Sequence, residues 1–148
     1  MRKKLGFVLA AIILIGGTIV ISIQLSPRHQ AKSAIDAFYS YEQEGKFAES
    51  WEMFHPQMKE KFEKGTYMED RAHVFLNHFG VNTFSYTLSD VDKKSNWRME
   101  NGASRLSEVY EVTVTQTYKG TYGRFELSQP VYATEEEGEW KVLWDYKE

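Results

Sequence analysis

The sequence predicts an α+β fold, a cone-shaped roll of about three helices packed on a curved antiparallel sheet of about four strands, preceded by one transmembrane helix. Three observations predict it. Residues 5–25 form one uncharged, mostly apolar run, residues 27–80 place apolar side chains at a helical period, and residues 84–146 alternate apolar and polar side chains. Helices and strands that are segregated along a chain are typical of α+β domains with antiparallel sheets.

The apolar run at residues 5–25 is long enough to cross a membrane, since a helix of that length spans about 31 Å. A cleaved signal peptide is the alternative, but its apolar core is shorter and ends at small-x-small residues, which residues 22–27 lack. An uncleaved anchor is therefore favoured. The basic residues of segment 1–4 should stay in the cytoplasm, which makes the protein single-pass in the plasma membrane and places residues 26–148 outside.

Composition limits what the part beyond the anchor does. The chain has 148 residues and a net charge of -3, and the basic start carries three of its cations, so residues 26–148 are acidic. Nucleic-acid-binding domains show a basic patch, and none is present, so no nucleic-acid partner is expected. The chain has no cysteine, which excludes disulfides and thiolate chemistry. Residues 26–148 have the length of one domain.

The first helix of the domain is predicted to start at Ser26-Pro27, because proline is favoured at the first helical position. Gly45 is expected to end it. Its apolar face follows the helical period and consists of Ala31, Ala34, Ile35, Phe38 and Tyr41 or Glu42.

A second, shorter helix follows, and its apolar side chains are Phe47, Trp51 and Phe54. It should end near His55, because Pro56 disfavours helical geometry in the residue before it. Met58 and Phe62 are assigned to a further short turn.

The third helix is predicted to begin with a capping box at residues 66–69, where a threonine and a glutamate satisfy each other's backbone N–H groups. Gly80 supplies the stop. The face expected to be buried consists of Met68, Ala72, Phe75, Leu76 and Phe79.

The period then changes to two, which indicates strands. The side chains expected to face the core are Phe84, Tyr86 and Leu88; Tyr110, Val112 and Val114; Phe125 and Leu127; Val131 and Ala133; and Trp140, Val142, Trp144 and Tyr146. Turns fit at residues 101–102, 119–120 and 137–138, where each pair includes a glycine.

Short segments spread over residues 28–146 are typical of one family. They are A-I-D-A-F at 34–38, G-K-F at 45–47, W-E-M-F at 51–54, Tyr67, H-F-G-V at 78–81 and G-E-W-K-V-L-W-D at 138–145. On these segments the chain resembles the NTF2-like N-terminal transpeptidase domain. That domain is the non-catalytic module before the transpeptidase in certain low-affinity penicillin-binding proteins of Gram-positive bacteria. The W-K-x-x-W-D close is the most specific segment.

The resemblance implies an NTF2-like accessory or spacer domain outside the membrane, linked to cell-wall synthesis or to the response to β-lactam antibiotics. Its partners would be cell-envelope proteins or the peptidoglycan-synthesis machinery, and no cofactor is implied. It does not imply catalysis, because no serine has a lysine three residues on, and S-D-N-like and K-T-G elements are missing. We therefore expect no transpeptidase activity.

An NTF2-like enzyme or small-molecule sensor is the alternative, and it would use a cavity between helices and sheet. Asp36 and Tyr39 are its candidate residues, as a base and an oxyanion donor. In the simpler interpretation Asp36 is solvated and Tyr39 is partly buried. An open pocket of about 300 Å³ with converging polar groups would favour the enzyme or sensor.

Trp97 lies in a polar stretch beside Lys94 and Arg98, and two interpretations stay open. It is either an exposed contact for a partner or glycan, or a cover over the end of the sheet. A metal site is not expected, because His73 and His78 lack the spacing that puts two histidines on one helical face.

Overall fold

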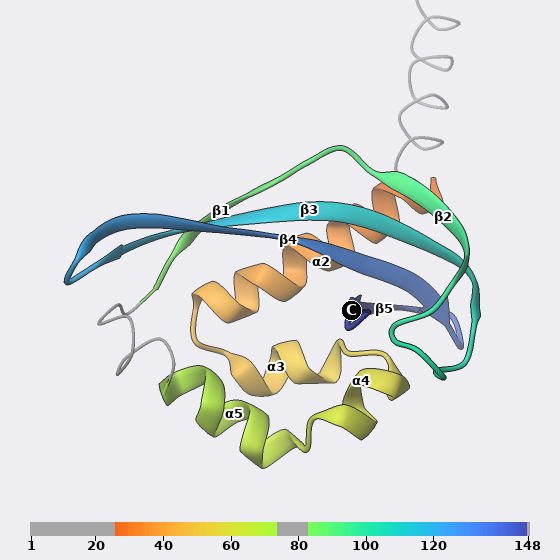
Figure 1. The fold of residues 1–148 in the computed structure, drawn as a ribbon, viewed down its shortest axis with the longest axis horizontal. Coiled ribbons are helices and arrows are strands. Elements are labelled where there is room, and N and C mark those ends of the chain that lie inside the picture. Colours follow the sequence, from red (N-terminus) through yellow and green to blue (C-terminus); the bar gives the residue numbers. More distant parts are fainter. Residues whose placement is uncertain (1–25, 74–82, 148) are drawn as a thin grey trace, which may run out of the picture.

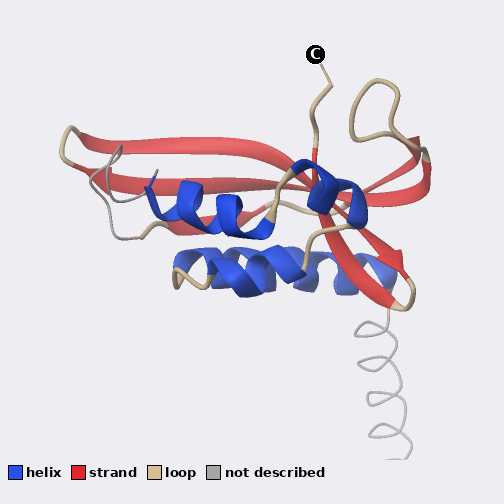
Figure 2. Ribbon diagram, turned by 90° about the horizontal axis from the view of Figure 1, so that it is seen from below, coloured by secondary structure: helices blue, strands red, loops and turns tan. Residues whose placement is uncertain are grey.

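Four helices pack on one face of a five-stranded antiparallel sheet in the part of the chain that the structure, a computed structural model, describes, residues 26–73 and 83–147 (Figures 1 and 2). The helices are α2 (Pro27–Gln43), α3 (Phe47–Glu52), α4 (Pro56–Lys61) and α5 (Lys64–His73). The strands are β1 (Ser85–Leu88), β2 (Asp92–Trp97), β3 (Leu106–Gly120), β4 (Gly123–Glu136) and β5 (Glu139–Trp144). The predicted α+β class with an antiparallel sheet is confirmed.

The numbers of helices and strands differ from the prediction of about three and about four. The turn expected around Met58 is the helix α4, which His55 caps by accepting a hydrogen bond from the backbone N–H of Gln57 at 3.2 Å. Strand β2 was not predicted, because its first five residues are polar and exposed and show no apolar alternation. Pairing with β3 holds β2 in place.

Strand β3 is the central strand of the sheet. Strands β1 and β2 both pair with one edge of β3, β2 near its start and β1 near its end. Strand β4 pairs with the other edge along residues 123–133, and β5 pairs with β4 only at residues 131–136. The turn between β3 and β4 therefore projects beyond the described helices (left in Figure 1).

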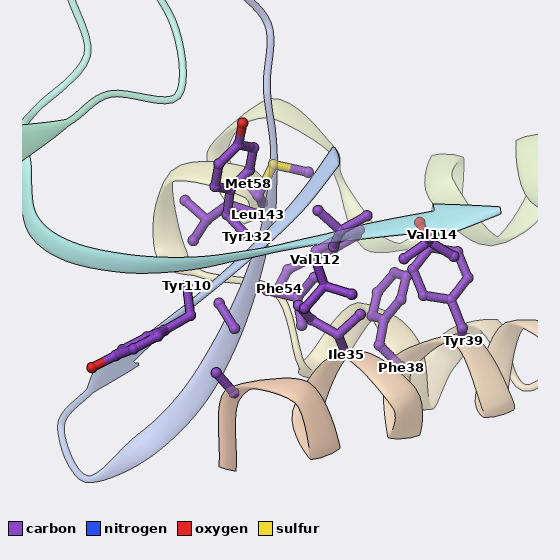
Figure 3. Close-up of a cluster of buried hydrophobic side chains, with 14 of the residues drawn as sticks. Ile35, Phe38, Tyr39, Phe54, Met58, Tyr110, Val112, Val114, Tyr132 and Leu143 are labelled. Atoms are coloured by element: carbon purple, nitrogen blue, oxygen red, sulfur yellow. The ribbon is translucent and has the colours of Figure 1, made fainter. Parts of the chain in front are cut away.

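Helix α2 lies against the sheet as its sequence predicts. The hydroxyl of Ser26 accepts a hydrogen bond from the backbone N–H of His29 at 3.3 Å and caps the helix, with proline at the first position. Figure 3 shows Ile35, Phe38 and Tyr39 pointing from α2 towards the valines of β3. These three side chains are fully buried.

Strand β5 joins the sheet to the helical layer. Its Val142 donates a backbone hydrogen bond to Met53 at 2.9 Å and accepts one from His55 at 3.1 Å, which forms an isolated parallel bridge. The ring of Trp144 lies 5.1 Å from that of Phe54 and 6.0 Å from that of Phe38. Aromatic rings therefore fill the junction between helices and sheet.

Helix α5 differs from the prediction in the residue that caps its start and in the side chain that it buries. The carboxylate of Glu63 accepts a hydrogen bond from the backbone N–H of Thr66 at 2.9 Å, so the capping group lies three residues before the expected capping box. Tyr67 is buried, whereas Met68, predicted for the core, is 37% exposed. The predicted residues 75–80 lie outside the described residues.

The predicted membrane anchor at residues 5–25 also lies outside the described residues. Among residues 26–73 and 83–147, no helix has the length and apolar character needed to cross a membrane.

Candidate functional site

A cluster of polar side chains lies inside the helical layer, where apolar packing was expected. The interior polar cluster consists of Glu42 of α2, Ser50 of α3, and Tyr67 and Arg71 of α5. Glu42 follows Phe38 and Tyr39 on the buried face of α2 and is only 2% exposed. Tyr67 and Arg71 are four residues apart, so they extend from the same face of α5.

Glu42 accepts hydrogen bonds from the three other members of the cluster. Its Oε1 accepts from the hydroxyl of Ser50 at 2.5 Å and from that of Tyr67 at 2.6 Å. Its Oε2 accepts from Nε of Arg71 at 2.7 Å, and a second guanidinium nitrogen lies 2.5 Å from the same oxygen. Both carboxylate oxygens are thus engaged, which is the condition for burying a charge.

The electrostatics of the cluster keep Tyr67 and Arg71 in their ordinary charge states. Burial raises the pKa of Tyr67, and the adjacent Glu42 charge raises it further. Burial acts to lower the pKa of Arg71, but the Glu42 carboxylate outweighs it and the pKa is raised. The phenol remains a hydrogen-bond donor at neutral pH, and the guanidinium remains charged. The arrangement ties α2, α3 and α5 together.

Tyr39 lies beside this cluster and has a partner of its own. It is fully buried, and its hydroxyl accepts a hydrogen bond from the amide Nε2 of Gln129 on β4 at 2.7 Å. Burial raises the pKa of Tyr39 well above its usual range. Gln116 on β3 is also buried, and its Nε2 donates to no described residue.

The structure does not bring Asp36 and Tyr39 together as a base and a phenol. Asp36 lies on the exposed side of α2, where its Oδ1 accepts a hydrogen bond from the hydroxyl of Tyr86 at 2.9 Å. Tyr39 instead bonds to Gln129. The two candidates of the enzyme hypothesis therefore belong to different networks, although the rings of Tyr39 and Tyr86 are 5.8 Å apart.

Trp97 covers the sheet instead of standing in solvent. Its ring is buried, and its centroid lies 4.3 Å from that of Tyr132 on β4. The ammonium group of Lys147 lies 5.0 Å from the centre of the indole. Of the two interpretations of Trp97, the structure matches the cover over the sheet.

Both ring nitrogens of His55 contact other groups of the fold. Its Nδ1 caps α4, and its Nε2 lies 3.5 Å from a carboxylate oxygen of Glu136. Burial lowers the pKa of His55, and the Glu136 charge opposes this shift. No group of three or more histidine, aspartate or glutamate residues within 26–73 and 83–147 is arranged to hold a metal ion.

Three clefts lined by described residues are open to solvent, and the smallest has a volume of only about 280 Å³. The largest lies between helices α2 and α3 and strand β5. It has a volume of about 560 Å³ and is lined by Ala37, Tyr41, Glu49, Glu52, Met53, Glu139, Trp140 and Lys141. The second, of about 370 Å³, is lined by Gln57, Glu60, Lys61, Met99, Glu100, Gly102, Ala103 and Ser104. Both of these larger clefts are rimmed by carboxylates and lysines, and neither includes Asp36, Tyr39 or the interior polar cluster.

Glu42 was predicted on the buried face of the first helix only as an alternative to Tyr41, and Arg71 was not predicted as a functional residue. The available signal was a charge on an apolar helical face, which requires a partner elsewhere. Nothing in the sequence identifies Arg71 as that partner, because the two residues are 29 positions apart. No protein-family model matches this chain, and a search of curated proteins finds no significant match to it.

Proposed function

We propose that this chain is a membrane-anchored accessory or spacer domain that works outside the plasma membrane and is not an enzyme. Residues 1–4 would lie in the cytoplasm, residues 5–25 would form the anchor, and residues 26–148 would form an NTF2-like, cone-shaped domain. Its role would be to support cell-wall synthesis or the response to β-lactam antibiotics by contacting peptidoglycan-synthesis enzymes.

The observation that carries this proposal is that the segments typical of the family contact one another in the folded chain. The W-E-M-F segment at 51–54 and the W-K-x-x-W-D segment at 140–145 are joined by the backbone bridge between Phe54 and Val142. The rings of Phe54 and Trp144 pack edge to face at 5.1 Å, and the A-I-D-A-F segment contributes Phe38 to the same contact. Segments far apart in sequence form one junction between helices and sheet. This supports the NTF2-like interpretation.

The interior polar cluster supports a non-catalytic role. Acid–base catalysis needs a titratable group within reach of a substrate. The Glu42 carboxylate is instead engaged by Ser50, Tyr67 and Arg71. The raised pKa values of Tyr39 and Tyr67 leave both phenols without the ability to act as bases near neutral pH.

A second candidate function, an NTF2-like small-molecule sensor or enzyme, is favoured by Gln116. Its buried Nε2 is a donor without a described acceptor, close in the sheet to the strand that carries Gln129. Buried donors are normally paired, so a polar ligand could supply the acceptor. A ligand that stabilises the wild-type chain but not Gln116→Leu in a thermal-shift screen would favour this candidate.

The test of the proposal is photo-crosslinking in intact cells. A benzophenone amino acid would replace Tyr122, which is fully exposed at the β3–β4 turn, and Asn101, on an exposed loop, would serve as the matched position. We expect a covalent adduct with a peptidoglycan-synthesis enzyme, identified by mass spectrometry, from one of the two faces. Absence of such an adduct from both positions would overturn the proposed partner class.

The anchor is tested separately on the same cells. The full chain should stay in the membrane fraction after carbonate extraction, and protease added to intact protoplasts should digest residues 26–148. Protection of that part from protease would show that the proposed orientation is wrong.

A further inference from the structure

Strand β4 has one edge that is paired along only part of its length. Strand β3 covers its first edge, whereas β5 covers the second edge only at residues 131–136. Residues 123–130 therefore form an open strand edge in the part of the chain that the structure describes. An open edge presents unpaired N–H and C=O groups, which are a template for another strand.

The hairpin geometry shows which backbone groups face outward. Gly120 pairs with Gly123 across a two-residue turn, so Gly123 and every second residue after it direct their N–H and C=O groups towards β3. The backbone groups of Arg124, Glu126 and Ser128 consequently point to the open edge. No hydrogen bond joins them to another described residue.

Pro130 explains why β5 stops where it does. By the same alternation, the backbone nitrogen of Pro130 faces the second edge of β4, and proline has no N–H to donate. Proline within a sheet is found at such open edges. Pairing with β5 ends at Val131, one residue after Pro130, and the edge is open from there to the turn.

The charged residues on this edge can pair with the same residues of a second copy of the chain. An antiparallel second copy can form a hydrogen-bonded ladder only if outward-facing residues lie opposite one another. Placing Arg124 opposite Arg124, or Glu126 opposite Glu126, sets like charges together. Placing Arg124 of each copy opposite Glu126 of the other forms two favourable charge pairs. This register also sets Phe125 opposite its own counterpart.

We propose that two copies of this chain associate through this edge of β4, with Arg124 of each copy paired to Glu126 of the other. The two five-stranded sheets would then form one continuous sheet. Tyr122, which is fully exposed at the turn, would lie opposite Ser128 of the second copy.

The symmetry of this pair suits two chains held in one membrane. Antiparallel pairing that continues a sheet has a two-fold axis normal to the sheet. Because the described helices cover one face of the sheet (Figure 2), both copies of α2 lie on the same side of the joined sheet. The two copies of Ser26 also lie at the same height along this axis, so two anchored chains can enter one membrane that is perpendicular to it.

The absence of cysteine makes a direct test possible, since any introduced thiol is unique. In the full chain in native membranes, Phe125→Cys would place two thiols at a directly opposed position, where Cα atoms are about 4.5 Å apart and a disulfide can form. We expect a disulfide-linked dimer under mild oxidation. Asn101→Cys, on an exposed loop away from β4, should give none.

Charge variants test the register. Glu126→Arg added to Phe125→Cys replaces two attractive contacts by two repulsive ones, and we expect roughly a tenfold loss of dimer. Adding Arg124→Glu as well restores the complementarity with the signs exchanged and should restore the dimer. This swap also preserves the charge pair within one chain, which joins Arg124 and Glu126 at 2.6 Å.

A second pair of variants avoids the aromatic side chain of Phe125. Co-expressed Arg124→Cys and Glu126→Cys chains, both altered at exposed residues, should form mixed dimers in preference to dimers of either alone. Failure of both designs to exceed the Asn101→Cys control would overturn the proposal, as would a crosslinked product whose mass shows a different protein. A dimer that forms without a peptidoglycan-synthesis partner would leave this inference standing while the proposed function failed.

Discussion

The two halves of β4 differ in what covers them, although both pair with β3 in one continuous register. Residues 131–134 are all buried, because β5 pairs with them and the helical layer lies against them. Residues 123–128 are all exposed, on both faces of the strand. The apolar alternation is the same in both halves, so alternation alone does not decide which half of a strand enters the core.

The two halves of β4 are therefore expected to have different roles, the covered half in folding and the outer half in association between chains. The covered half of β4 belongs to the junction that holds helices to sheet, whereas the outer half is exposed and leaves an edge open. Substitutions that affect folding should therefore cluster at the covered half, and those that affect association should cluster at the outer half.

Phe54→Ala should destabilise the chain the most. Phe54 is fully buried and contacts the rings of Phe38 and Trp144. Loss of such a side chain costs about 3–5 kcal/mol, because a cavity remains. Urea denaturation followed by tryptophan fluorescence would measure it. Tyr122→Ala, in the outer turn, is the matched control and should change the free energy of unfolding by less than about 0.5 kcal/mol. Equal losses would contradict the division.

Arg71→Met should reduce stability by about 3 kcal/mol, because it leaves the Glu42 carboxylate buried without its cation. Glu42→Gln combined with Arg71→Met removes both charges and keeps an acceptor for Ser50 and Tyr67. The double variant should recover most of the loss in a double-mutant cycle. If the two single losses simply add, the buried pair is not coupled as the structure indicates.

Val131→Ala and Leu127→Ala compare the two halves directly. Val131 is fully buried, and its truncation should cost roughly 2 kcal/mol. Leu127 is 48% exposed, so its truncation should cost less than about 1 kcal/mol. Thermal unfolding of both variants under one condition would rank them. A larger loss for Leu127→Ala would show that the outer half is covered in solution.

His55 makes the covered side of the molecule sensitive to acid. Its pKa is lowered in the folded state by burial, so below about pH 6.5 the unfolded chain binds a proton that the folded chain does not. Stability should therefore fall as the pH falls through that window. His55→Asn keeps an acceptor for the cap of α4 and should show a smaller difference in stability between pH 7.5 and 5.5.

A substitution of Glu136 should change the pH dependence of stability in the opposite direction to His55→Asn. The Glu136 carboxylate raises the pKa of His55 against the effect of burial. Glu136→Gln should therefore lower the folded-state pKa of His55 further and increase the loss of stability on the acid side. A flatter profile than that of the wild type would contradict this assignment.

Local signals predicted most elements of the fold. The proline at the start of α2 and the change of period after residue 83 were sufficient to predict the class, the first helix and four of the strands. Strand β2 was missed, because polar residues form a strand there only through the ladder with β3. The start of α5 was misplaced, because the prediction relied on a capping box at residues 66–69, whereas in the folded chain the Glu63 carboxylate accepts from the backbone N–H of Thr66.

The candidate site was harder to predict than the fold. Asp36 and Tyr39 were chosen because they lie close on one helix, yet their hydrogen bonds go to different strands. The interior polar cluster joins residues from three helices, and sequence spacing contains no information on such contacts. The indole of Trp97 was open to two interpretations until its ring was seen to pack on Tyr132.

By itself, the sequence determined the α+β class, the buried face of α2 and the approximate places of most strands, because these follow from periodicity and turn chemistry within a few residues. Only the tertiary structure decided that Glu42 is paired with Arg71, that Trp97 is covered, and that β4 is closed by β5 along only part of its edge. Burial and pairing depend on which distant segment packs over a residue, and that is a property of the whole folded chain.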